Sequence, residues 1–146
     1  MCNHVGFTAC QEDVSVRNIK GAYRYKSSGI VQTAAPDGTS VRTHALTETG
    51  ILELVSLHDG NDLLLTFNQS GGGVYSTQAA ASEDALRFDP FTRMMTVDLE
   101  TYNVEVSGRG EVYDNTLILY LTLNGKSVSS DKTLQGTDIQ MLAQKN

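Results

Sequence analysis

The sequence contains no tryptophan and only two prolines, and both of its cysteines, Cys2 and Cys10, lie within the first ten residues. The rest of the chain therefore has no disulfide cross-link and no cysteine nucleophile. Charged residues make up only 19% of the chain, below the roughly 25% typical of soluble domains. A chain of 146 residues still buries about 68–70% of its unfolded surface, so we expect a packed core without cross-links.

An excess of basic residues and a long apolar run are also lacking. Eleven Lys and Arg residues stand against seventeen Asp and Glu residues, which gives a net charge of −6. Nucleic-acid binding depends on neutralising phosphates, so nucleic acid is not a predicted partner. No apolar run approaches the roughly 20 residues of a membrane-spanning helix, and the negative charge disfavours anionic lipid surfaces.

Alternating apolar residues are the clearest positive feature. Leucine occupies every second position from Leu117 to Leu123, between Ile118, Tyr120 and Thr122. Period-two alternation bounded by turn residues predicts a strand with one buried face. Asp114-Asn115 before this run and Asn124-Gly125 after it are predicted to be turns, because these residues tolerate positive φ.

The same pattern recurs along most of the chain. Further strands are predicted at Gly21 to Val31, Val41 to Thr47, Ile51 to His58, Leu63 to Phe67, Arg93 to Leu99, Lys126 to Leu134 and Thr137 to Leu142. Only the alanine-rich segment Gln78 to Leu86 could form a turn or two of helix, and Asp89-Pro90 enforces extended geometry after it. About nine or ten strands joined by short turns predict an all-β antiparallel meander.

The amino terminus carries a second pattern. Phe7-Thr8-Ala9-Cys10 resembles the end of a bacterial lipoprotein signal, in which small residues precede a cysteine that becomes lipidated. A complete signal has roughly 7–15 apolar residues before this point, so this interpretation expects a leader that begins upstream. It predicts a lipidated Cys10, a signal remnant or flexible tether over residues 1–17 and a place in the cell envelope. The alternative is an amino terminus without function.

A resemblance to a family rests on the start of the first strand. Gly21-Ala22-Tyr23 resembles the Gly-x-Trp opening of lipocalins, with Tyr23 in the position of the tryptophan that plugs the barrel base. The layout resembles the calycin-like lipoproteins of Bacteroides-type bacteria. This implies an up-and-down meander over residues 18–146, closed into a lipocalin-like barrel of about eight strands, which also removes exposed edges. No arginine follows the last strand to stack on the plug residue, and a two-sheet β-sandwich is the alternative fold.

The barrel interpretation predicts a function in binding. A barrel of eight strands is either filled by side chains or holds one small ligand. We expect a small, largely apolar ligand, lined by inward residues of the predicted strands. The candidates are Tyr23, Tyr25, Leu63, Leu65, Phe67, Met95, Val97, Leu99, Leu117, Leu119 and Leu121. The same residues could instead pack as a filled core, and the protein would then bind a partner through its loops or outer face, with Tyr102, Tyr113 and Tyr120 as outward candidates.

No catalytic or cofactor motif accompanies this pattern. His44 and His58 have no nucleophile motif nearby and are interpreted as structural or surface residues. The cluster of Cys2, His4 and Cys10 lacks a fourth zinc ligand. Asp59 to Asp62 lacks the closing Glu of a calcium loop, and Gly71-Gly72-Gly73 lacks the Lys and Ser or Thr of a phosphate loop. The sequence therefore predicts a protein without enzymatic activity, metal or cofactor.

Overall fold

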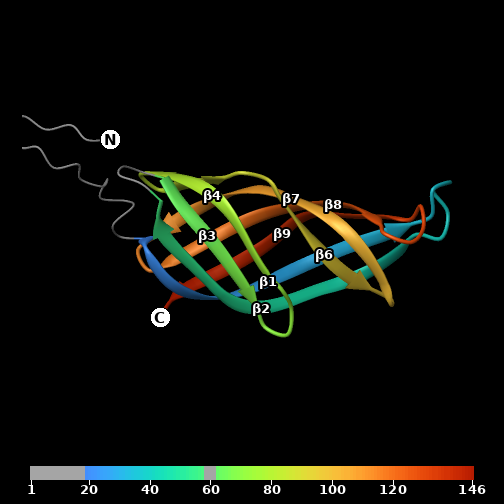
Figure 1. The fold of residues 1–146 in the computed structure, drawn as a ribbon, viewed down its shortest axis with the longest axis horizontal. Helices are drawn as coiled ribbons and strands as arrows, with labels where there is room; N and C mark the ends of the chain where they lie inside the picture. The colour runs from blue at the N-terminus through green and yellow to red at the C-terminus, as the bar shows by residue number, and fades with distance from the viewer. Residues whose placement is uncertain (1–18, 58–61) are drawn as a thin grey trace, which may run out of the picture.

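The computed structural model describes residues 19–57 and 62–146, and these residues form nine antiparallel β-strands (Figure 1). The strands are β1 (Gly21–Ala34), β2 (Arg42–Ser56), β3 (Asp62–Gln69), β4 (Val74–Ser82), β5 (Ala85–Phe88), β6 (Phe91–Val97), β7 (Glu100–Tyr113), β8 (Thr116–Ser127) and β9 (Thr133–Lys145). The prediction of an all-β antiparallel chain is confirmed.

The strands close into a barrel. Neighbours in sequence pair with one another from β1 to β5 and from β6 to β9, and β9 also pairs with β1. The ring is completed by Ala85–Arg87 of β5, which pair with Arg109–Glu111 of β7. Eight strands therefore form the closed barrel and β6 is an additional strand on β7. The lipocalin-like barrel is confirmed, and the alternative of a two-sheet sandwich is wrong.

The wall of the barrel has an open stretch beside β6. β3 pairs with β2 only from Gly50 onward, so Arg42–Thr49 of β2 pair on one side only, with β1. β6 likewise pairs only with β7. In Figure 1 β3 and β4 end near the middle of the barrel, whereas β1, β2, β8 and β9 run on toward the β1–β2 and β8–β9 loops. Two strand edges without a ladder partner therefore border the same opening.

The core follows the alternation of the strands. On β8 the side chains of Leu117, Leu119, Leu121 and Leu123 are each at most 7% exposed, as predicted. Each buried leucine contributes roughly 1.5–3 kcal/mol relative to an exposed one. The Phe67 and Phe91 rings stack at 5.3 Å between centroids, so the apolar interior is continuous from the closed barrel to the extra strand.

Tyr23 lies in the core near the start of β1. Its side chain is fully buried, and its hydroxyl donates a hydrogen bond to the Ile19 carbonyl at 2.7 Å. Burial raises the pKa of Tyr23 to about 12. The Lys145 ammonium, at the end of the last strand, lies 5.8 Å from the centre of the Tyr23 ring. This lysine of β9 is therefore within the range of a cation–π contact with the Tyr23 ring.

Two turn predictions had opposite outcomes. Asp114-Asn115 is a two-residue hairpin between β7 and β8, as predicted. Asn124-Gly125 is not a turn, because β8 continues through it and Gly125 pairs with Val104. A Cβ at Gly125 would lie 2.8 Å from the Asn103 carbonyl oxygen. The glycine therefore permits a close approach of strands rather than a positive φ, and the chain reverses after β8, at residues 128–132.

The predicted helical turn and one predicted surface residue are also corrected. Gln78 to Leu86 lies mainly in β4 and β5, because pairing with β3 and β7 outweighs the weak helix preference of its alanines. Tyr102 was expected to face outward but is only 2% exposed. It lies on the inward phase of β7 together with Val104. Tyr113, by contrast, is 52% exposed, as predicted.

A candidate binding groove

The predicted ligand-lining residues lie mostly in a packed core. Of the eleven, all except Val97 and Leu99 are at most 7% exposed. Tyr25, Phe67 and Leu121 line an inner cavity of about 30 Å³, which is the space of roughly one water molecule. The other buried candidates line none of the cavities described here: Tyr23, Leu63, Leu65, Leu117 and Leu119. The barrel interior is therefore filled by side chains, and this inner cavity is too small for an organic ligand.

Leu99 is a correction. It was expected to point inward in phase with Met95 and Val97, but its side chain is 100% exposed. β6 ends at Val97, and Asp98 and Leu99 form the turn to β7 with φ of 52° and 66°. Alternation applies only within a strand, so the register ends before Leu99.

A larger hollow opens beside β6. This groove, which we call the β2–β6 groove, has a volume of about 640 Å³ and is bordered by β2, β6 and the β3–β4 loop. Its volume lies in the roughly 300–1,000 Å³ range of small-molecule sites. Met95 and Val97, two of the predicted lining residues, line it together with Val31 and Leu46. The glycines Gly71 to Gly73 border it as a strand-to-strand loop.

A polar cluster of three side chains spans the groove where the two free edges face each other. Arg93 of β6 donates from Nη1 to Glu48 Oε1 at 2.8 Å and from Nη2 to Glu48 Oε2 at 2.9 Å. Gln69 of β3 accepts from Arg93 Nη2 through Oε1 and donates through Nε2 to Glu48 Oε2, both at 2.8 Å. We call Arg93, Glu48 and Gln69 the Arg93 cluster. It connects three strands across the open stretch of the wall.

The Arg93 cluster is shielded from water and flanked by tyrosines. The Arg93 and Glu48 side chains are 13% and 15% exposed, and the Arg93 guanidinium lies 4.9 Å from the centre of the Tyr75 ring. Burial lowers the pKa of Arg93, but the hydrogen bonds and charge of Glu48 outweigh it and hold that pKa above its ordinary value. Burial, followed by the nearby Glu48 charge, raises the pKa of Tyr25 to about 12.

The cluster separates the groove from the inner cavity. Glu48, Arg93 and Tyr75 line both spaces, so the cluster forms a polar floor under the groove. Arg93 Nε is buried and has no hydrogen-bond acceptor. A buried donor without an acceptor costs about 1–3 kcal/mol, which makes this atom a place where an added acceptor would be favourable.

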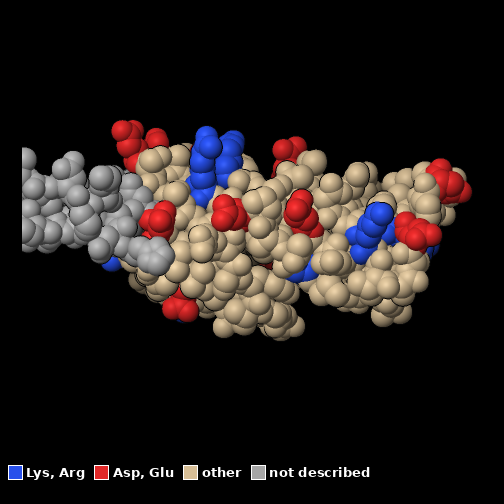
Figure 2. Space-filling model, turned by 45° about the horizontal axis from the view of Figure 1, so that its top comes forward, with Lys and Arg blue, Asp and Glu red and all other residues tan. Residues whose placement is uncertain are grey.

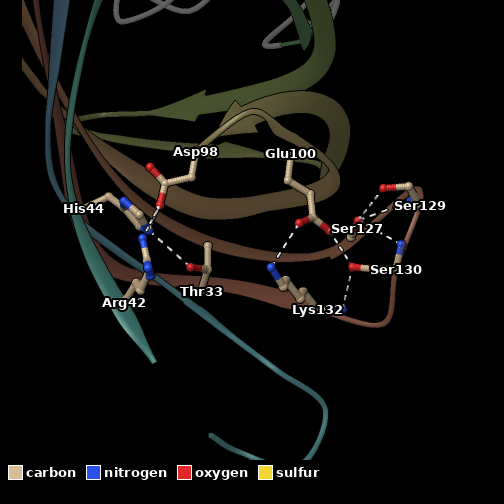
Figure 3. A network of polar contacts seen from close by, with 9 residues as sticks. All are labelled: Thr33, Arg42, His44, Asp98, Glu100, Ser127, Ser129, Ser130 and Lys132. Carbon is tan, nitrogen blue, oxygen red and sulfur yellow. Dashed lines mark hydrogen bonds and ion pairs between the residues drawn. The ribbon is translucent and has the colours of Figure 1, made fainter. Parts of the chain in front are cut away.

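A second polar network lies next to the groove, around a separate hollow of about 350 Å³ (Figure 3). Glu100 at the start of β7 accepts from Ser130 and forms an ion pair with Lys132 at 3.3 Å. A hydrogen bond from Ser127, followed by the contacts with Ser130 and Lys132, lowers the pKa of Glu100. Asp98 in the neighbouring turn lies 3.5 Å from Arg42 of β2. The β6–β7 turn is therefore connected both to the β8–β9 loop and to the start of β2.

His44 belongs to this network. Its Nε2 lies 3.1 Å from the Thr33 hydroxyl and 3.7 Å from an Asp98 oxygen. The side chain is 18% exposed and lines the groove. With Thr33 and Asp98 as neighbours, His44 has the contacts of a structural residue at the wall of the groove.

No member of the Arg93 cluster was among the site residues predicted from the sequence. A signal was nevertheless present, because each member shares the inward phase of its strand: Glu48 with Leu46, Gln69 with Phe67, and Arg93 with Met95. A charged residue in the inward phase of an alternating strand indicates a buried partner. The partner could not be identified, because Glu48 and Arg93 are 45 residues apart.

Several sequence predictions concern residues outside the described part of the chain. Cys2, His4 and Cys10 lie before residue 19, and His58 with Asp59-Gly60-Asn61 lies between β2 and β3. Within residues 19–57 and 62–146, no group of three or more His, Cys, Asp or Glu side chains is placed to hold a metal ion. In the same residues, no helix is long and apolar enough to cross a membrane.

The face of the molecule in Figure 2 carries acidic and basic side chains interspersed among uncharged ones, without a large patch of one sign. Charge therefore distinguishes no site on this face, and the β2–β6 groove is the candidate site because of its volume and the Arg93 cluster at its floor. No protein-family model, curated protein or solved structure was found to match this chain.

Proposed function

We propose that this barrel binds a small amphipathic ligand in the β2–β6 groove. The observation that carries the proposal is an open hollow of about 640 Å³ that is lined by polar and apolar side chains and has one shielded polar cluster at its floor. In small-molecule sites, apolar side chains provide contact area and placed polar groups fix the orientation of the ligand. The apolar part of the ligand would lie against Leu46, Met95 and Val97, and its polar end would meet the Arg93 cluster.

The proposal places the ligand beside the barrel core rather than deep inside it. The inner cavity of about 30 Å³ leaves no room for an organic molecule unless the core opens. Because this interior is filled, the second candidate function is a module that binds a partner protein through its surface. The exposed Tyr113 on the outer face is its best-placed contact residue.

Native mass spectrometry of the full chain, purified gently from a lipid-containing bacterial host, tests the proposal. We expect an added mass that organic solvent removes. Val97→Trp, at a groove-lining position in the inward phase of β6, should abolish it. Ala80→Trp, exposed on β4 and outside the groove lining, is the matched control and should retain it.

A protein without added mass, which also stays free of ligand after incubation with medium-chain lipids, would contradict groove binding. The surface-binding candidate would then be tested by partner capture with Tyr113→Ala against the unaltered chain.

We also propose that the protein acts in the cell envelope through a lipid on Cys10. The support is the resemblance of Phe7-Thr8-Ala9-Cys10 to the end of a lipoprotein signal. Expressed with a complete signal in a Gram-negative host, the chain should fractionate with membranes, and Cys10→Ser should move to the soluble fraction. Equal distribution of both forms would exclude lipidation at this residue.

A further inference from the structure

The guanidinium of Arg93 has one incompletely satisfied edge. Glu48 takes one bond from Nη1 and one from Nη2, so the end of the guanidinium is occupied by a bidentate carboxylate. The adjacent edge, which carries Nη2 and Nε, has Gln69 Oε1 as its acceptor on Nη2. Nε is buried without any acceptor. One further oxygen atom therefore completes the hydrogen bonding of Arg93.

The charge of Arg93 is already balanced. Glu48 is its close anionic partner, and both side chains are shielded from water. A second carboxylate at the Nε edge would place two negative charges around one positive charge in a partly desolvated site, which is unfavourable. A carbonyl oxygen accepts the same hydrogen bond and leaves the charge balance unchanged.

The groove geometry provides the rest of the site. Arg93 lines the groove together with Met95 and Val97 of the same strand face. A chain anchored at Arg93 can therefore lie along the side of the groove that Met95 and Val97 line. Gln69 comes from the end of β3, where the β3–β4 loop begins, so its amide can be displaced without disturbing a strand centre.

We propose that Arg93 anchors the ligand through Nε, and that the ligand is an uncharged carbonyl compound, an ester or an amide, rather than a free carboxylic acid. The inference rests on the proposed function of the groove and specifies the chemical class it selects. Gln69 is the internal stand-in for the ligand carbonyl on the neighbouring Nη2.

Three probes of equal chain length separate the possibilities: octanamide, methyl octanoate and octanoate, titrated into the full chain at neutral pH by NMR or calorimetry. We expect the amide and the ester to bind roughly tenfold more tightly than the acid, as one charge-assisted hydrogen bond without repulsion implies. Glu48→Gln removes the competing charge and should reverse the order in favour of octanoate. Arg93→Met should abolish the difference between the probes.

One control variant and one further variant of the cluster complete the test. Arg109→Met removes an arginine that also pairs with a glutamate and covers a tyrosine ring, but on the outer face, and it should change nothing. Gln69→Ala keeps the ion pair of Arg93 with Glu48 and frees Nη2, so octanamide can accept from both Nη2 and Nε and should bind more tightly. Circular dichroism establishes that each variant is folded before titration.

The outcomes distinguish the two levels of the proposal. If none of the probes binds and no cellular ligand is found, the groove function itself is wrong. If the probes bind but octanoate binds as well as octanamide, or if Arg93→Met binds all three as the unaltered chain does, the groove function stands and the role of Arg93 is overturned. A water molecule in the inner cavity would then be the acceptor for Nε.

Discussion

Two clusters of arginine, glutamate and tyrosine lie in different surroundings in this barrel. Arg93 and Glu48 are 2.8 Å apart with side chains 13% and 15% exposed, whereas Arg109 and Glu111 are 3.6 Å apart with side chains 63% and 36% exposed. Each arginine covers a tyrosine ring, at 4.9 Å for Tyr75 and 4.5 Å for Tyr120.

The difference between the clusters lies in solvation. Water and salt screen the outer pair, and exposed pairs of this kind contribute about 0–1 kcal/mol. The inner pair has lost most of its hydration, so each partner depends on the other. The same residue types therefore add little to stability on the outer face, whereas in the inner cluster they stabilise the barrel and form the proposed binding site.

The largest effect on stability is expected when the inner pair of Arg93 and Glu48 is broken. Arg93→Met should lower the free energy of unfolding by about 3–5 kcal/mol, because it leaves Glu48 as an unpaired buried charge. Arg109→Met should lower it by less than about 1 kcal/mol. Urea unfolding followed by circular dichroism measures both. The double variant Arg93→Met with Glu48→Met should recover most of the loss, and a double variant as unstable as Arg93→Met would contradict this account.

The next effect concerns two tyrosines of the core, Tyr23 and Tyr25. The pKa values of Tyr23 and Tyr25 are raised from 10.0 to about 12. The unfolded chain loses these protons near pH 10 and the folded chain keeps them to about pH 12. Stability should therefore be complete below pH 10 and fall between pH 10 and 12. Thermal unfolding across this range should show a shallower fall for Tyr25→Phe, and an unchanged profile would refute the assignment.

A smaller effect is expected from the neutral member of the inner cluster. Gln69→Ala removes two hydrogen bonds, to Arg93 and Glu48, but leaves the ion pair in place. We expect a loss of about 1–2 kcal/mol. Thr66→Ala is the comparison on the same strand. Thr66 lies three residues earlier, on the opposite face of β3, and is hydrogen-bonded to Ser76. A loss as small as that of Thr66→Ala would mean that Gln69 adds little to the cluster.

The smallest effect lies in the outer cluster. Hydrogen bonds from Tyr113 and then Tyr120 lower the pKa of Glu111. A lowered carboxyl pKa contributes stability above the ordinary pKa of glutamate, and this contribution is lost as the pH falls through the folded value. Glu111→Gln should therefore slightly flatten the acid side of the stability profile and leave neutral pH nearly unchanged. A clear loss at pH 7 would show that this exposed cluster does more than we infer.

The sequence predicted the barrel better than it predicted the site. Alternation along Leu117 to Leu123 identified the buried face of β8 correctly, because a strand that packs on one face needs apolar residues at every second position. Predictions from turn preferences failed where pairing with strands distant in the sequence determined the structure. Gly125 lies in β8 because it pairs with Val104 of β7 and Leu134 of β9, which no turn preference can indicate.

The sequence by itself determined that this chain forms antiparallel strands with one apolar face each, and that these faces turn toward a common core. Only the tertiary structure decided that the core is filled, that β3 and β4 end early, and that β6 adds to β7 outside the closed ring. These features place Glu48, Gln69 and Arg93 together at one opening. The physical reason is that alternation is a local consequence of backbone geometry, whereas the meeting of residues 45 positions apart depends on strand register and closure.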